Sequence, residues 1–276
     1  TWLAARCHDC FGHVRPCGDD GYLPAANALK HVERTLRMIG VLGGMGPLAT
    51  FDFFSKVLAA TPAKGDSDHV PMLIQTDPRI PARPAAILSG GLSPLPELLA
   101  GRNRLVAAGA TALVMPCNTA HYWYADLLDG CSVPFLSIVD ASLNELSLLA
   151  GAGSTIGIIA TRATLAAKIS DPALIRLGYK IILPEDTVTD TLILPGIELV
   201  KLGDPLRGGH LIEQAVQALL DQGARAVILA CTETPLALDA VKSPLRIHCV
   251  DSTAALARAC VAWWQSQPVS LGSIEI

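Results

Sequence analysis

A long apolar run, a secretory leader and a basic face are three features that this 276-residue sequence lacks. No apolar run approaches the roughly 20 residues that a membrane-spanning helix needs. Residues 1–23 have no apolar core of the kind that a signal peptide carries. The net charge is −4 and the lysines and arginines are scattered, which argues against nucleic acid and anionic membrane surfaces as partners.

The composition indicates a large buried core and free thiols. The chain is 51% hydrophobic and 17% charged, so it can fold around an extensive core, and its length suits one large domain or two small ones. Eight cysteines are present. Since no secretory route is visible, we expect thiols rather than disulfides and a cytoplasmic location.

Short apolar segments alternate with segments that are apolar at helical spacing, which predicts an α/β fold. The strand candidates are apolar on successive residues, as in a parallel sheet that is buried on both faces. They are residues 38–43, 71–76, 112–116, 134–139, 155–160, 180–184, 226–230 and 246–250.

One unit of the sequence occurs twice. A glycine–alanine pair, an apolar strand and a cysteine follow one another in each copy, and Cys231 follows Cys117 by the same interval that separates Gly223 from Gly109. We interpret this as two pseudo-symmetric domains, each a parallel sheet flanked by helices, with a site in the cleft between them. The alternative is the general similarity of α/β units. The expected boundaries are 38–132 plus 246–276 for the first domain and 133–245 for the second.

Residues 1–37 lie outside this scheme. They hold Cys7, Cys10 and Cys17 with His8 and His13, and a Cys-x-x-Cys pair beside histidine is one pattern that binds zinc. The segment has little apolar periodicity, so we expect a disordered or non-native leader before Met38 and no metal site.

Two cysteines follow strand candidates and precede helix starts. In open α/β sheets the active crevice lies at the carboxyl ends of the strands, which is where Cys117 and Cys231 fall. The N–H groups and positive field of a helix N-terminus favour thiolate over thiol. Two thiols that face each other can act as acid and base on opposite faces of one carbon. The alternative for each cysteine is a small core residue.

Five stretches resemble the aspartate/glutamate racemase family, and its aspartate racemase branch most. They are IGVLGGMGPLAT (39–50), IPARPAAIL (80–88), MPCNTAHYWY (115–124), IATRATL (159–165) and ACTETP (230–235). The resemblance covers the chain from Met38 to near its end. It implies two pseudo-symmetric α/β domains, two catalytic cysteines, no cofactor and a homodimer.

The resemblance also implies roles for individual residues. Cys117 and Cys231 match the acid/base thiols, and Asn118, Thr119 and Thr232 match residues around the substrate α-carboxylate. Arg83 and Lys201 match site cations, and Met45 and Gly46 would border the substrate. A guanidinium can grip a carboxylate through two hydrogen bonds, which suits a small dicarboxylic amino acid. Arg83 and Lys201 could instead be solvated.

Further residues near these motifs have open roles. Glu233 could begin a helix or hold the substrate amino group, and His121 could tune Cys117 or pack a helix. The glycines of residues 43–47 lack the spacing of a nucleotide-binding loop and more readily allow close approach of a small ligand. The sequence departs from the family pattern at Asp77, Ala82, Arg162, Ala163 and Ala230, which puts the preference for a dicarboxylate in question.

The sequence therefore predicts a cofactor-independent racemase that acts on aspartate. Glutamate racemase, hydantoin racemase and cysteine-dependent maleate isomerase are the competing enzyme functions. A two-domain protein that binds a small acid without turnover is the competing function from a different class.

Overall fold

A computed structural model of the chain describes residues 37–266 and contains two four-stranded parallel sheets. The first sheet has the order β2-β1-β3-β4, with β1 at Ile39–Gly43, β2 at Met72–Thr76, β3 at Ala112–Val114 and β4 at Phe135–Leu136. The second repeats this order as β6-β5-β7-β8, with β5 at Thr155–Ile159, β6 at Lys180–Ile182, β7 at Ala226–Leu229 and β8 at Cys249–Asp251. The α/β class and the two similar sheets are confirmed.

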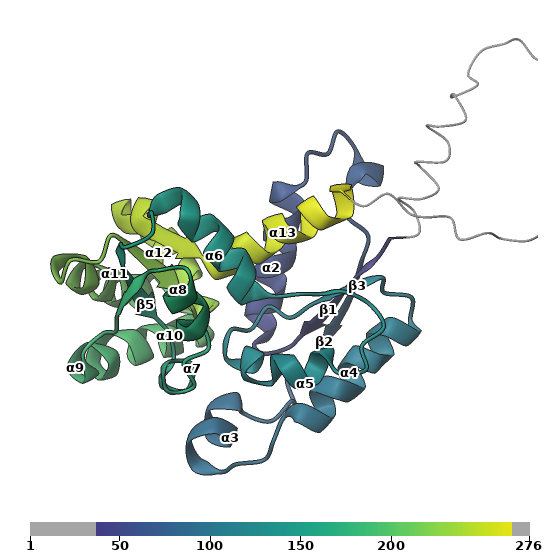
Figure 1. The fold of residues 1–276 in the computed structure, drawn as a ribbon, viewed down its shortest axis with the longest axis horizontal. Helices are drawn as coiled ribbons and strands as arrows, with labels where there is room; N and C mark the ends of the chain where they lie inside the picture. The colour runs from purple at the N-terminus through teal and green to yellow at the C-terminus, as the bar shows by residue number, and fades with distance from the viewer. Residues whose placement is uncertain (1–36, 267–276) are drawn as a thin grey trace, which may run out of the picture. The chain divides into compact units, whose positions relative to one another are not determined.

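The inner strands β1, β3 and β7 are buried along their whole length and β5 is buried except at Thr155, because helices cover both faces of each sheet (Figure 1). The helices that precede β5 in the chain are α2 (Pro47–Ala60), η1 (Asp66–Asp68), α3 (Arg83–Ser89), α4 (Leu95–Ala107), η2 (Thr119–Trp123), α5 (Tyr124–Leu128) and α6 (Ile138–Leu149). Those that follow β5 are α7 (Arg162–Ala166), α8 (Asp171–Arg176), α9 (Asp186–Val188), η3 (Thr189–Ile193), α10 (Leu194–Lys201), α11 (Pro205–Asp221), α12 (Glu233–Ala240), η4 (Pro244–His248) and α13 (Ser252–Ser266).

Every predicted strand extends beyond the observed one, and two of them include helical residues. Residues 134–139 contain only the short strand β4, because Ser137 caps a helix that starts at Ile138 by accepting a hydrogen bond from the Asp140 N–H. Residues 246–250 are mostly the 3₁₀ helix η4, and β8 begins at Cys249. Apolar content alone does not separate a strand from a short helix.

The last helix of the described chain returns to the first sheet. Leu256, Cys260 and Trp264 of α13 pack with Phe53 of α2 and Ile39 of β1 in one buried cluster. Helix α6 contributes Ile138 and Ala141 to the same cluster, whereas its Leu143 and Leu146 pack on the second sheet. The two halves are therefore joined by the packing of α6 and α13 as well as by the chain.

Sheet membership moves the expected domain borders. Strand β4 pairs with β3 in the first sheet, and β8 pairs with β7 in the second, so residues 133–137 and 246–251 belong to the opposite halves from those expected. We propose borders of 38–137 plus 252–266 and 138–251. The leader prediction lies outside the described residues except for Arg37, which donates a hydrogen bond to the Trp264 carbonyl.

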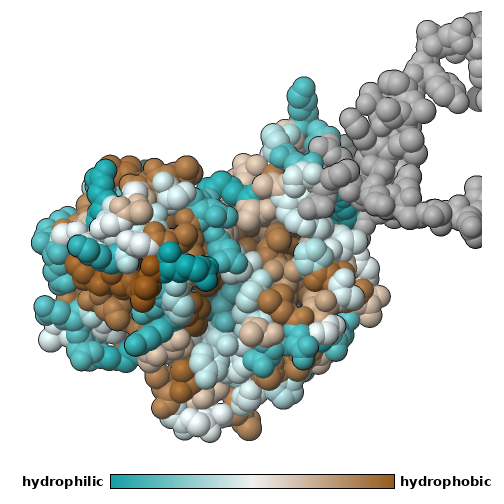
Figure 2. All heavy atoms as spheres, in the orientation of Figure 1, coloured by the Kyte–Doolittle hydropathy of each residue, from teal (hydrophilic) through white to brown (hydrophobic). Residues whose placement is uncertain are grey.

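Figure 2 shows apolar residues scattered among polar ones on the viewed face. Several large apolar side chains are exposed, among them Phe51, Leu92 and Leu148. None of the helices that the structure describes is both long and apolar enough to cross a membrane.

The packing of α13 yields a stability prediction. Leu256 is completely buried, so Leu256→Ala should lower the free energy of unfolding by about 2–5 kcal/mol through lost contacts and an unfilled cavity. The control Leu148→Ala removes a side chain that is 84% exposed and should change it by less than about 0.5 kcal/mol. Urea unfolding of both variants measures the difference. Equal losses would contradict the place of α13 in the core.

Candidate active site

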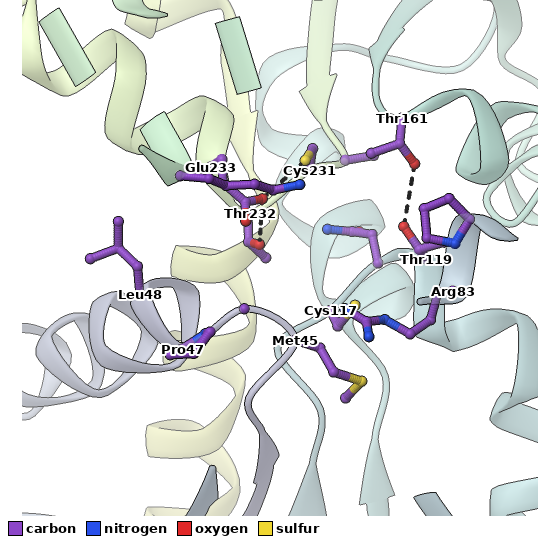
Figure 3. A pocket seen from close by; sticks show the side chains of 15 residues that line it. Met45, Pro47, Leu48, Arg83, Cys117, Thr119, Thr161, Cys231, Thr232 and Glu233 are labelled. Atoms are coloured by element: carbon purple, nitrogen blue, oxygen red, sulfur yellow. Dashed lines mark hydrogen bonds between the residues drawn. The ribbon is translucent and has the colours of Figure 1, made fainter. Parts of the chain in front are cut away.

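A cavity of about 300 Å³ lies at the carboxyl ends of strands from both sheets (Figure 3). Its walls come from the loop after β1, the start of α3, the segments after β3 and β7, and the end of α10. All nine residues predicted for the site line it: Met45, Gly46, Arg83, Cys117, Asn118, Thr119, Lys201, Cys231 and Thr232. The fold thus gathers residues that are far apart in the sequence, as expected for the carboxyl edges of parallel sheets.

Six further residues complete the lining: Pro47, Leu48, Pro84, Thr161, Ala230 and Glu233. The sequence motifs left the role of Glu233 open and did not single out Thr161. Thr161 lies two residues after the end of strand β5, and its hydroxyl accepts a hydrogen bond from the Thr164 N–H at the start of α7. A polar residue just after a buried strand is the signal that could have identified it.

Cys117 is 6% exposed and lies where the chain leaves β3 for the 3₁₀ helix η2. Burial raises the pKa of its thiol above the ordinary 9.0. The Arg83 guanidinium and the Ala120 N–H act in the opposite direction, because each stabilises the thiolate. In Figure 3 Arg83 extends from α3 toward this sulfur.

Cys231 is 7% exposed and lies where β7 leads into α12. Its thiol donates a hydrogen bond to Glu233 Oε2 at 3.1 Å, and the Thr232 hydroxyl donates to the same oxygen at 3.1 Å. Burial and the adjacent Glu233 carboxylate raise the pKa of Cys231 well above its ordinary value, while Lys201 lowers it. Cys231 is therefore held as a neutral thiol.

The helix N-termini, which favour the thiolate, do not outweigh burial at either sulfur, so the pKa of both thiols is raised. Helices do start at Thr119 and Glu233, and N–H groups do reach the sulfurs. Desolvation is the largest influence on the pKa of each thiol and exceeds this stabilisation. The sequence pattern located the helix starts, but it could not indicate how deeply the sulfurs are buried.

Two cations face the cavity. Arg83 donates from Nη1 to the carbonyls of Ile80 and Pro81, and its buried Nε has no hydrogen-bond partner within residues 37–266. Lys201, at the end of α10, forms no ion pair with a carboxylate in that range. Among the described residues, the buried Arg83 Nε–H without a partner and the Lys201 ammonium without an ion pair are well suited to bind an anionic ligand.

The glycines of the first loop serve the packing of the chain rather than a ligand. Gly44 has a φ of +95°, and a Cβ there would lie 2.2 Å from the Asp77 backbone nitrogen, so only glycine fits. Gly43 is packed against Thr50. Gly46 alone is open toward the site, where a Cβ would lie 3.9 Å from Glu233 Oε1. The sequence-based interpretation holds only for Gly46.

The departures from the family pattern add no free charge to the cavity. Asp77 pairs with Arg79, and Arg162 pairs with both Asp186 and Asp190, and none of these residues lines the cavity. Ala82 precedes α3 as its cap, and Ala163 is buried within α7. Ala230 lines the cavity next to Cys231 and brings only a methyl group.

His121 supports the backbone of Cys117 rather than its sulfur. Its Nε2 accepts a hydrogen bond from the Ile138 N–H at 3.1 Å, which leaves Nδ1–H to donate to the Cys117 carbonyl at 2.9 Å. Burial lowers the pKa of the ring from 6.5 to about 4, so the imidazole is neutral. His121 thus links the cysteine loop to the start of α6.

The comparisons with known proteins agree with this geometry. The family model described as Asp/Glu/hydantoin racemase matches residues 42–260. The chain belongs to the Asp/Glu/hydantoin racemase family. It is therefore an isomerase that acts on small amino-acid substrates.

Individual members of the family are similar over most of their length. The broad-specificity amino-acid racemase RacX of Bacillus subtilis is 28% identical over 229 residues, which are 82% of this chain and 97% of RacX. Picrophilus torridus aspartate racemase has a TM-score of 0.73 and 28% identity, covering 83% of this chain and 94% of that one. Glutamate racemase from Francisella tularensis, solved with D-glutamate, shares the fold with a TM-score of 0.58 at 17% identity, covering 82% and 80%.

No group of three or more histidine, cysteine, aspartate or glutamate side chains within residues 37–266 is arranged to hold a metal ion. The zinc alternative at Cys7, Cys10 and Cys17 falls outside the described residues.

The environment of His121 predicts a pH dependence of stability. Its pKa is 6.5 in the unfolded chain and about 4 in the folded one, so the unfolded state binds the proton first. Its contribution is fully present above pH 6.5 and is lost as the pH falls toward 4, by about 1.4 kcal/mol at pH 5.5. Between pH 7.5 and pH 5.5, the free energy of unfolding measured in urea should therefore fall by this much less in His121→Asn than in the wild type. The control His210→Asn alters an exposed ring and should keep the wild-type pH dependence. The same pH dependence in His121→Asn as in the wild type would contradict the assignment.

Proposed function

We propose that the chain is a cofactor-independent aspartate racemase in which Cys117 and Cys231 are the acid/base groups. The observation that carries the proposal is that two buried thiols, each following the third strand of its half of the chain, line one cavity. We assign substrate binding to the remaining predicted residues of the lining: Met45, Gly46, Arg83, Asn118, Thr119, Lys201 and Thr232.

The proposed reaction transfers one proton to the enzyme and another from it. The thiolate of one cysteine removes the α-proton, and the electron pair of the broken C–H bond remains on the substrate, delocalised into the α-carboxylate. The thiol of the other cysteine then donates its proton to the opposite face of the α-carbon. The second sulfur ends as the thiolate, so the enzyme is ready for the opposite enantiomer and the pair titrates as a coupled unit.

The surroundings of the two sulfurs favour one starting state. Arg83 and the Ala120 N–H stabilise an anion at Cys117, whereas Glu233 accepts a hydrogen bond from Cys231 and disfavours an anion there. We therefore infer that Cys117 is the first of the two to ionise and that Cys231 starts as the acid. The near-repeat in the sequence does not distinguish the two, because it includes neither Arg83 nor a counterpart of Glu233 after Cys117.

The charges of the cavity suit aspartate. Arg83 and Lys201 bring two cations and Glu233 brings one anion. Aspartate carries two carboxylates and one ammonium group, so each charge has a partner of opposite sign. The volume of about 300 Å³ is at the small end of the range for ligand pockets, which favours a small amino acid.

One observation favours a wider substrate range. A second cavity, of about 490 Å³, shares Pro84, Thr161 and Lys201 with the first and has apolar walls at Leu88 and Leu194. A longer side chain could extend into it, and the similarity to a broad-specificity racemase supports this second candidate. Racemization of glutamate or a hydantoin, maleate isomerization, and binding without turnover are the functions that compete with these two candidates.

A homodimer and a cytoplasmic location are further proposals. Sedimentation of the purified protein measures the oligomeric state.

The function is tested by the circular dichroism of L-aspartate incubated with the protein in the absence of cofactor. Decay of the signal to zero is the expected result, and further amino acids assayed in parallel define the substrate range. A rise in melting temperature with aspartate but no decay would replace the proposal with a binding protein.

The two-thiol reaction predicts the behaviour of serine variants. Cys117→Ser and Cys231→Ser should each lower kcat/KM by at least about 10³-fold, or roughly 4 kcal/mol, because a hydroxyl is too weak an acid to ionise near neutral pH. Cys249→Ser is the matched control, since Cys249 is also 7% exposed but does not line the cavity. In D₂O the first inverted product should carry deuterium at the α-carbon. Full activity in Cys231→Ser would exclude the two-thiol reaction.

The position of Glu233 predicts the pH profile of kcat/KM, which reports groups of the free enzyme. Because the pKa of both thiols lies above 9.0, the rate should still rise with pH near 9. Glu233→Gln removes a carboxylate that raises the pKa of Cys117 as well as that of Cys231, so the alkaline rise should move to lower pH. Glu97→Gln, at an exposed residue that lines neither cavity, should leave the profile in place. A rise that stays at the wild-type pH in Glu233→Gln would show that this carboxylate does not control the thiol.

A further inference from the structure

Ser252 connects the segments that carry the two cysteines. Its hydroxyl donates a hydrogen bond to the Leu229 carbonyl at 2.8 Å and accepts one from Asn118 Nδ2 at 2.9 Å. Asn118 directly follows Cys117, and Leu229 is the last residue of β7, two positions before Cys231. A single side chain thus bridges the ends of β3 and β7.

The bridge is shielded from water. Ser252 is completely buried and Asn118 is 5% exposed. A buried hydrogen bond that is broken leaves its partners without a substitute, so both bonds restrict the distance between the two segments. Ser252 itself does not line the cavity.

The hydroxyl is not needed to start helix α13. The Asp251 carboxylate accepts a hydrogen bond from the Ala254 N–H at 2.9 Å and so caps the first turn. Asp251 is in turn paired with Lys56 and Arg246. The helix start is therefore held by its own set of contacts, and the Ser252 side chain bonds across the halves instead.

We propose that Ser252 is a positioning residue that sets the relative placement of Cys117 and Cys231 on the substrate. This inference rests on the proposed two-thiol function. Delivery of a proton to the face opposite its removal requires both sulfurs to lie at the correct distance from one carbon atom. A displacement of about 1 Å can cost on the order of 100-fold in rate.

Ser252→Ala tests the proposal by removing both bonds. We expect kcat to fall by about 10- to 100-fold with KM changed by less than about threefold, because the sulfurs move while the cations Arg83 and Lys201, which hold the carboxylates, keep their own contacts. The matched control is Ser142→Ala, which also removes a buried hydroxyl, one that donates to the Ile138 carbonyl within α6 and lies outside the cavity. It should keep the wild-type kcat.

Isotope exchange separates positioning from a loss of folded protein. When the second thiol delivers its proton slowly, the first has time to exchange with D₂O and to return deuterium to the original face. The ratio of exchange without inversion to inversion, measured by mass spectrometry of the two enantiomers, should therefore rise in Ser252→Ala and stay at the wild-type value in Ser142→Ala. Partial unfolding lowers both rates equally and leaves the ratio unchanged.

The outcomes are distinct. An unchanged ratio and kcat in Ser252→Ala would overturn the role of Ser252 while leaving the two-thiol function intact. If Ser252→Ala does not fold, Ser252→Cys, whose thiol is a weaker hydrogen-bond donor, is compared with the control Ser142→Cys. The proposal requires that the ratio of exchange without inversion to inversion rise in Ser252→Cys and stay at the wild-type value in Ser142→Cys. A wild-type protein that neither exchanges nor inverts aspartate would contradict the proposed function itself, and the role of Ser252 with it.

Discussion

Desolvation of two thiols is the constraint on which the chemistry of this cavity depends. Both sulfurs are almost completely buried, and burial raises the pKa of each. The proposed reaction needs one of them as a thiolate, so the surrounding charges decide which one ionises. Arg83 and a helix N–H act on Cys117, whereas the Glu233 carboxylate acts against ionisation of Cys231. In the proposed reaction, the same burial would keep bulk water away from the carbanionic intermediate.

The relative placement of the two thiols depends on contacts between the halves. Helix α13 returns to the first sheet, and α6 packs on both sheets, so the apolar core holds the halves together. Buried polar contacts restrict the orientation in which the two halves pack. Ser252 joins Asn118 to Leu229, and the Thr119 hydroxyl lies 2.8 Å from that of Thr164 on α7. Apolar packing holds the two halves together, whereas buried hydrogen bonds of this kind favour one orientation of the halves among several that bury a similar area.

We propose that substrate choice depends on a different part of the site. The family includes relatives named for aspartate, for glutamate and for a broad range of amino acids, and this chain is equally similar, at 28% identity, to an aspartate racemase and a broad-specificity racemase. The residues that depart from the family pattern do not alter the charge of the cavity, because Asp77 and Arg162 are paired outside it. The adjoining cavity past Lys201 is where the side chains of different substrates would diverge.

The sequence by itself determined the α/β class, the repeat and the position of Cys117 and Cys231 at strand ends, because buried parallel strands and the residues that follow them are local patterns. The other seven predicted residues of the cavity came from the resemblance to the racemase family. The sequence also located the helix starts after Cys117 and Cys231. Only the tertiary structure decided that both are held as thiols, that Gly44 serves the packing of Asp77, and that β4 and β8 belong to the sheets that they do. The roles of Ser252 and His121 emerged in the same way. Burial, charge pairing and long-range hydrogen bonds arise between segments distant in sequence, such as Asn118 and Ser252, and no local pattern encodes them.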